Sequence, residues 1–198
     1  MNGRIPTPDL LPPRMPRLRD GLRRRICRLI LRLCGWSLLG EFPDVSKAVL
    51  IAAPHSSWWD GIWGLLMKAG IGADVHFMAK QELFTGPLGS LLRQLGGMPI
   101  DRSAAKGVVE QMIDQFRQRD VLWLGIAPEG TRKHVARWRS GFWHIARAAG
   151  VPIVPAYFNY ANRTIGVGPL FETSADMDAD LARLRTFYAP FKGKHHDV

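Results

Sequence analysis

Cysteine is nearly absent from this sequence, with two in a chain of 198 residues. Cys27 and Cys34 are seven positions apart in a predicted helix, which puts their Cα atoms about 10 Å apart, too far for a disulfide. We therefore expect no disulfide and a reducing compartment. A run of about 20 apolar residues is also lacking, since residues 26–39 are interrupted by Arg28 and Arg32. No membrane-spanning helix is expected.

Acidic residues are scarce relative to basic ones, with 17 Asp and Glu against 27 Lys and Arg and a formal net charge of +10. Most of the excess lies in residues 1–40, where nine arginines face Asp9 and Asp20, a net of +7. A concentrated basic segment attracts a polyanion, either nucleic acid or an anionic membrane surface.

Residues 17–39 are predicted to form a basic amphipathic helix, because apolar side chains recur at helical spacing among arginines. Arginine stems can lie on apolar surface while their guanidinium groups reach lipid phosphates, so this pattern favours an anionic membrane surface and a peripheral place on its cytoplasmic face. Nucleic acid is not expected, because the tryptophans fall within apolar helices rather than on a basic strand platform. The alternative is an ordinary helix docked on the core with solvated arginines. The apolar stripe consists of Leu22, Ile26, Leu29, Ile30, Leu33 and Trp36.

Five prolines in residues 1–16 predict a flexible or extended arm. Residues 17–198 are predicted to form a single α/β domain, in which strands and helices alternate after the N-terminal helix. Such alternation predicts a mostly parallel central sheet flanked by helices. The predicted strands are 47–53, 74–79, 98–100, 121–126, 153–158 and 163–167, and the later helices are 58–68, 87–95, 103–119, 140–149 and 177–188.

A first polar run, residues 54–60, directly follows a predicted buried strand. Its His55 and Asp60 would point about 140° apart on a regular helix, so they can meet only if His55 lies in the turn before the helix. Asp60 would then fix one imidazole nitrogen, and the other could take a proton from a bound hydroxyl. Alternatively, Ser57 caps the helix and the histidine is incidental.

A second polar run, Pro-Glu-Gly-Thr-Arg at residues 128–132, also follows a predicted strand. Gly130 permits a tight turn, and Arg132 presents a guanidinium suited to phosphate. Glu129 could hold Arg132 or bind a substrate hydroxyl. Arg102, which follows two glycines and a short predicted strand, could be the other arm of a phosphate clamp. Because loops at the carboxyl ends of parallel strands gather at one edge of the sheet, we expect these residues to meet there.

With Val-Pro-Ile-Val-Pro at residues 151–155, a possible acyl-chain slot or a plain core strand, these runs resemble the four blocks of the glycerolipid acyltransferase superfamily over residues 48–158. The resemblance implies transfer of a fatty acyl group from acyl-CoA or acyl carrier protein to the hydroxyl of a lysophospholipid such as 1-acylglycerol-3-phosphate, in phospholipid biosynthesis. It implies no cofactor beyond that thioester co-substrate. The roles it implies are His55 as base, Asp60 as its partner, and an acceptor-phosphate site of Arg102, Glu129, Gly130, Thr131 and Arg132.

Three positions depart from the blocks of that family. Ala127, Pro54 and Lys133 stand where the family often has Phe, Asn and Ser, which suggests an offshoot whose acceptor could differ from lysophosphatidic acid. Two alternatives remain, a thioester or phosphoester hydrolase using the same His/Asp pair, and a non-catalytic basic module that binds lipid or nucleic acid. No metal-ligand spacing is present, and His195 and His196 are expected in a disordered tail.

Overall fold

The computed structural model describes residues 10–19, 21–101 and 107–198. These residues form a seven-stranded sheet in the order β1-β7-β6-β2-β5-β3-β4. Neighbouring strands are parallel except β6 and β7, which confirms the mostly parallel sheet predicted from the alternation of elements. The strands are β1 (Ser37–Leu39), β2 (Lys47–Ala53), β3 (Val75–Lys80), β4 (Gly97–Ile100), β5 (Leu122–Ile126), β6 (Ile153–Asn159) and β7 (Thr164–Val167).

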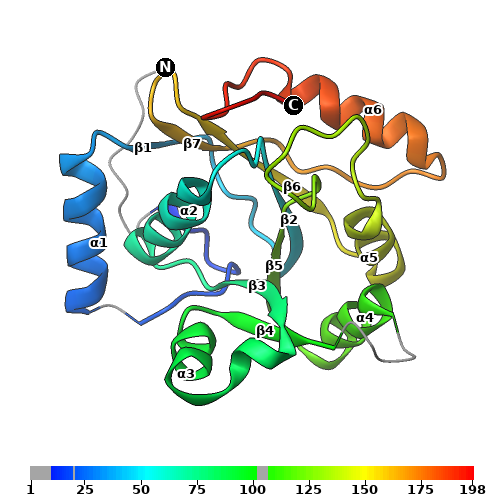
Figure 1. The fold of residues 1–198 in the computed structure, drawn as a ribbon. Coiled ribbons are helices and arrows are strands. Elements are labelled where there is room, and N and C mark those ends of the chain that lie inside the picture. Colours follow the sequence, from blue (N-terminus) through cyan, green and yellow to red (C-terminus); the bar gives the residue numbers. More distant parts are fainter. Residues whose placement is uncertain (1–9, 20, 102–106) are drawn as a thin grey trace.

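Helices cover both faces of the sheet (Figure 1). One core lies between the sheet and α1 and α2, and the other between the sheet and α4, α5 and α6. Because side chains alternate along a strand, Trp123 of β5 enters the first core while its neighbours Leu122 and Leu124 enter the second. The helices are α1 (Leu22–Leu33), α2 (Trp58–Ile71), α3 (Gly86–Gln94), α4 (Val108–Gln118), α5 (Gly141–Ala149), α6 (Met177–Tyr188) and the 3₁₀ helix η2 (Gln81–Phe84).

β2 lies at the middle of the sheet, paired with β5 on one side and β6 on the other. Its sequence is a nearly continuous apolar run, as expected for a parallel strand buried on both faces. Val49 and Ile51 enter the core beneath α4 and α5, and Ala48 enters the other. The carboxyl end of β2 is therefore flanked by the ends of two parallel strands.

The N-terminal region differs from its prediction in two ways. α1 ends at Leu33, and residues 37–39, predicted as helix, form β1 beside β7. Gly35 adopts a left-handed φ of 73°, which turns the chain between the helix and the strand. The arm expected over residues 1–16 is packed where it is described, since Leu11 and Met15 are buried in the core beneath α1 and α2. Proline disfavours helix interiors, but it does not prevent burial.

α1 rests on α2 through arginine side chains. Arg24 is 8% exposed, and its guanidinium donates to the carbonyl oxygens of Leu18 and Ile71, each at 3.0 Å. Arg28 donates to the carbonyl of Gly70 at 3.1 Å. Two of these three acceptors lie in the last turn of α2, where carbonyls lack helical partners and the helix dipole is negative.

The apolar stripe of α1 faces away from the protein. Of its six members only Trp36, which lies beyond the helix, is buried, and Leu33 is 77% exposed. α1 is docked on the core through Arg24, Cys27 and Leu31, with Arg23, Arg25 and Arg32 exposed, as the docked-helix alternative expects. The predicted apolar stripe nevertheless lies on the outer face of the helix. Within the described residues, no helix combines the length and the apolar character needed to span a bilayer. The exposed members are Leu22, Ile26, Leu29, Ile30 and Leu33.

Candidate active site

The predicted polar runs lie at the carboxyl ends of adjacent strands. β2 leads into the turn that holds His55, and β5 leads into residues 128–132. β6, on the other side of β2, leads into Tyr160. Since neighbouring strands are about 4.8 Å apart, three loops converge on one edge of the sheet.

His55 lies in the turn before α2, and Asp60 lies in the first turn of that helix. This is the arrangement that lets the two side chains meet, and Nδ1 of His55 is 3.5 Å from Oδ2 of Asp60. The distance is at the outer limit of a hydrogen bond. The Asp60 side chain is fully buried whereas that of His55 is 23% exposed, so a solvent-reachable imidazole is backed by a buried carboxylate.

The same carboxylate also caps α2. Oδ2 of Asp60 accepts the backbone N–H of Ser57 at 2.8 Å, while the Ser57 hydroxyl accepts the N–H of Trp59 at 3.2 Å. This is a capping box. The sequence presents the helix cap and the His/Asp pair as alternatives. In the structure, the Asp60 carboxylate takes part in both. Capping fixes the position of Asp60 independently of the histidine.

Tyr160, which the sequence analysis did not single out, completes the surroundings of Asp60. Its hydroxyl donates to Oδ1 of Asp60 at 2.5 Å. Burial, and then the hydrogen bond and charge of Asp60, hold the pKa of the Tyr160 phenol well above its ordinary value, so it remains a donor. Its ring packs edge-on against Trp36 at 5.1 Å, and Trp36 stacks on Trp63 at the same distance.

Two effects favour the neutral form of the His55 imidazole. Burial lowers its pKa, the charge of Arg132 lowers it further, and the opposing attraction of Asp60 does not restore it. With a carboxylate at Nδ1, the ring proton resides on Nδ1 and Nε2 presents a lone pair. Nε2 has no hydrogen-bond partner in the part of the chain that the structure describes. A neutral imidazole with a free Nε2 can take a proton from a hydroxyl.

Glu129 joins the two loops. It is 3% exposed, and its Oε1 accepts the backbone N–H of His55 at 2.8 Å. Burial raises the pKa of this carboxyl, which the His55 N–H partly offsets. Among the described residues Oε2 has no hydrogen-bond partner, and no ion pair joins Glu129 to Arg132. Glu129 thus holds the backbone of the histidine rather than Arg132, the contact considered from the sequence.

Arg132 lies beside the His55 loop on an aromatic ring. Its guanidinium carbon is 3.6 Å from the ring centroid of Trp58, which is 74% exposed. Gly130 adopts a left-handed φ of 66°, as expected for a tight turn, and the Thr131 hydroxyl accepts the N–H of Lys133 at 3.4 Å. Arg102 lies outside the described residues, so its place in the site stays a prediction.

Residues 151–155 do not line an open slot. Ile153 and Val154 are fully buried, on opposite faces of the sheet, and Pro155 pairs with Ile51 of β2. The core-strand alternative therefore describes this segment. Its contribution to the site is to place Tyr160 at the end of β6.

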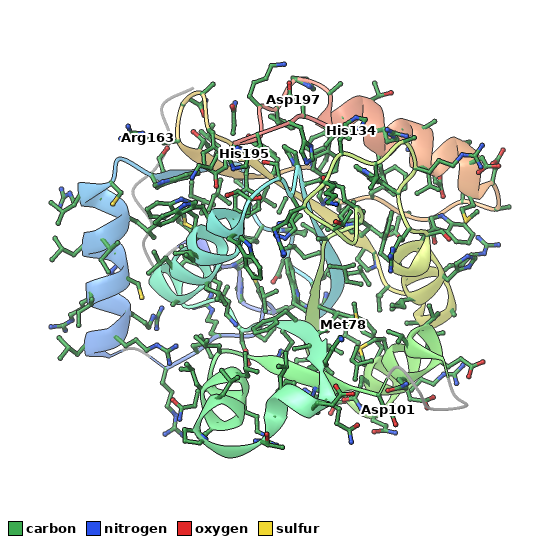
Figure 2. The ribbon with its side chains drawn as sticks, viewed as in Figure 1. Met78, Asp101, His134, Arg163, His195 and Asp197 are labelled. Atoms are coloured by element: carbon green, nitrogen blue, oxygen red, sulfur yellow. The ribbon has the colours of Figure 1, made fainter. Side chains whose placement is uncertain are left out.

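The segment after α6 is docked on the site, contrary to the disordered tail expected for His195 and His196. The Ser56 hydroxyl accepts the backbone N–H groups of Lys194 and His195 at 2.9 and 3.2 Å. Figure 2 shows His195 and Asp197 at the same end of the molecule as His134. Within the described ranges, His, Cys, Asp and Glu side chains form no group of three that could hold a metal ion.

Comparison with known proteins agrees with this geometry. A model of the Acyltransferase family matches residues 39–159, more than half of the chain. The 1-acyl-sn-glycerol-3-phosphate acyltransferase of Escherichia coli (strain K12) is 32% identical over 101 residues, which are 47% of this chain and 40% of that protein. The chain thus matches less than half the length of this relative.

A solved structure shares the fold. The crystal structure of the 1-acyl-sn-glycerophosphate (LPA) acyltransferase, PlsC, from Thermotoga maritima superposes with a TM-score of 0.57 at 17% sequence identity. The match covers 86% of this chain and 80% of that chain. At this identity the likeness supports the architecture alone, whereas the family match covers the loops that hold His55, Asp60 and Arg132. The chain belongs to the acyltransferase family.

Proposed function

We propose that this protein transfers a fatty acyl group from a thioester, acyl-CoA or acyl carrier protein, to the hydroxyl of a phosphate-bearing glycerolipid such as 1-acylglycerol-3-phosphate. One observation carries the proposal. His55, whose Nε2 has no partner among the described residues, and Arg132, with an exposed guanidinium, lie at adjacent strand ends, and Glu129 joins their two loops. A base next to a cation suits an acceptor that carries a hydroxyl and a phosphate.

In the proposed reaction, Nε2 of His55 removes the proton of the acceptor hydroxyl as its oxygen attacks the thioester carbonyl. The tetrahedral intermediate then expels the thiolate, and the imidazolium returns the proton to sulfur. Asp60 keeps the imidazole in the required tautomer and stabilises the imidazolium. General-base catalysis of this kind contributes about 10²–10⁴-fold, and approximation of the two substrates supplies much of the rest.

Arg132 binds the acceptor phosphate, with the turn at Gly130 and Thr131 presenting it. A guanidinium suits this role because it offers planar paired donors to phosphate oxygens. Its stacking on Trp58 holds the group in place at the surface. Arg102 is the second phosphate ligand in this proposal.

The acceptor lipid is reached from the cytoplasmic face of an anionic membrane, to which α1 attaches. The five exposed apolar side chains of α1 support this, because they lie on one helix among arginines that can contact lipid phosphates. The inward arginines, Arg24 and Arg28, bind α2 and so leave the apolar face outward. Two cysteines without a disulfide suit the reducing side of the membrane.

The test is incubation of the purified protein with radiolabelled acyl-CoA or acyl carrier protein and a panel of lyso-lipids, beside the His55→Ala variant. Formation of a diacyl product that needs both substrates and His55 is expected. Release of free fatty acid without any acceptor would identify a hydrolase instead. Lipid binding with no turnover of either thioester would identify a binding module.

A further inference from the structure

A segment that belongs to none of the four blocks lies against two of them. The hydroxyl of Ser56, a residue only 3% exposed, receives two backbone N–H groups, those of Lys194 and His195. The carbonyl of Lys192 accepts the N–H of Tyr160 at 2.9 Å. Residues 192–197, here named the brace, are thus hydrogen-bonded to Ser56, which follows His55 in sequence, and to Tyr160, which contacts Asp60.

Asp197 closes the brace on itself. Its carboxylate accepts from Nζ of Lys192 at 2.6 Å and from the N–H of Gly193 at 3.0 Å. The Lys194 ammonium lies over an aromatic ring of α2, with Nζ 5.0 Å from the ring centroid of Trp59. Trp58, the residue before Trp59, contacts the Arg132 guanidinium. Two adjacent tryptophans therefore each contact a cation from a different loop.

His196 is held in a way that favours its charged form. Nδ1 lies 3.1 Å from the carbonyl oxygen of Asp197, and Nε2 lies 3.0 Å from that of Arg132. Carbonyl oxygens only accept, so both hydrogen bonds form only when both ring nitrogens carry a proton.

The groups around His196 act in the same direction. Partial burial works to lower its pKa, but the two carbonyls and the negative charges of Glu129 and Asp197 outweigh it and raise the pKa. The ring of His134 faces it edge-on at 5.8 Å. The imidazolium therefore brings a positive charge to the backbone of the Arg132 loop.

We propose that the brace forms part of the acceptor-phosphate site. In this site Lys194 binds the phosphate, and the His196 imidazolium positions the Arg132 loop. The assignment rests on the proposed function for the identity of the acceptor. It adds to the four blocks a source of charge that depends on pH, because His196 loses one of its two hydrogen bonds as the pH rises through its raised pKa.

Three variants separate these roles. Lys194→Ala should raise the acceptor KM by about 10–100-fold with kcat within about twofold, since a lost charge-assisted hydrogen bond costs roughly this much. His196→Gln keeps a donor for the Arg132 carbonyl but has no charge, so its acceptor KM should rise less with pH than the wild-type value does. His196→Ala should lose both the hydrogen bond to the Arg132 carbonyl and the positive charge. The control is His195→Ala, because His195 contacts Ser56 through its backbone N–H, which alanine keeps.

A binding measurement keeps this inference separate from the reaction. The imidazole signals of the full chain are followed by NMR as pH is raised, with and without glycerol 3-phosphate, and His196 is assigned by its loss in His196→Gln. Tighter binding to the protonated form by threefold or more raises the pKa of His196 by about half a unit or more. An unshifted His196 titration, or acceptor kinetics of Lys194→Ala equal to wild type, overturns the inference even if acyl transfer is demonstrated. A shift seen without any acyl transfer supports the anion site while the proposed reaction fails.

Discussion

The two halves of the site are built in opposite ways. The half that follows β2 is buried, with Asp60 held by Ser57, Tyr160 and His55 through hydrogen bonds or close contact. The half that follows β5 ends in the exposed Arg132, which is held by stacking on an exposed ring. The backbone contact of Glu129 to His55 and the stacking of Arg132 on Trp58 join the two halves.

This contrast assigns different work to the two halves. A buried and hydrogen-bonded group keeps a fixed geometry, which proton transfer needs. An exposed cation gains little from the protein and is free to bind an anion arriving from solvent or from a membrane surface. We therefore expect changes in the buried half to lower kcat, and changes in the exposed half to raise the acceptor KM.

His55→Ala should give the largest effect, a fall in kcat of about 10²–10⁴-fold with a nearly unchanged KM, because it removes the base. The measurement is steady-state transfer of radiolabelled acyl groups in detergent. His144→Ala, on α5 and away from the site, is the matched control and should behave as wild type. If His55→Ala keeps the wild-type turnover, the buried half takes no part in the mechanism.

Arg132→Ala should raise the acceptor KM by about 10–100-fold with a small change in kcat, since hydrogen bonds to a charged group are worth about 1.5–3 kcal/mol. Loss of the guanidinium also removes a charge that lowers the pKa of His55, so the acid limb of the pH–rate profile should move to higher pH. Arg137→Ala, in the same loop region, is the control. An effect confined to kcat would contradict the division between the halves.

Tyr160→Phe should lower kcat by about fivefold to tenfold, in keeping with a lost hydrogen bond of about 1 kcal/mol to Asp60. Without the phenol, the carboxylate attracts the imidazolium more strongly and raises the pKa of His55. The fall in activity on acidification should then begin at higher pH than in wild type. Tyr157→Phe is the control, because its ring stacks on Phe191 rather than near Asp60. An unshifted pH profile would mean that Tyr160 acts only in packing.

The sequence predicted the parts of this site that depend on local order. The blocks that hold His55 and Arg132 each follow an apolar strand, so the strand-end rule places these two residues at one edge of the sheet. Tyr160 escaped prediction because strand order, which puts β6 beside β2, is a tertiary property, and because the strand was predicted to end at residue 158. The brace escaped because its contacts with Ser56 span 138 and 139 positions and carry no local pattern.

α1 shows the same limit for the fold. The spacing of its leucines predicts an amphipathic helix but not which face is buried. The buried face carries Cys27, Leu31 and Arg24, and the Arg24 guanidinium donates to the backbone carbonyls of Leu18 and Ile71. A side chain that satisfies otherwise unpartnered carbonyls can be buried in place of an apolar one.

Leu33→Ser should give the smallest effect on the enzyme and sharpen the same contrast between buried and exposed groups. Because Leu33 is 77% exposed, stability should change by less than about 0.5 kcal/mol and kcat in detergent should be unchanged. Binding to anionic vesicles should weaken by about threefold to tenfold, as one apolar side chain is withdrawn from lipid. Leu170→Ser, exposed on another surface, should bind vesicles as wild type does. Arg24→Met, in contrast, should lower the free energy of unfolding by about 1–3 kcal/mol, because it leaves buried carbonyl groups without donors. Equal vesicle binding by Leu33→Ser and wild type would leave the outward face of α1 without its proposed lipid partner.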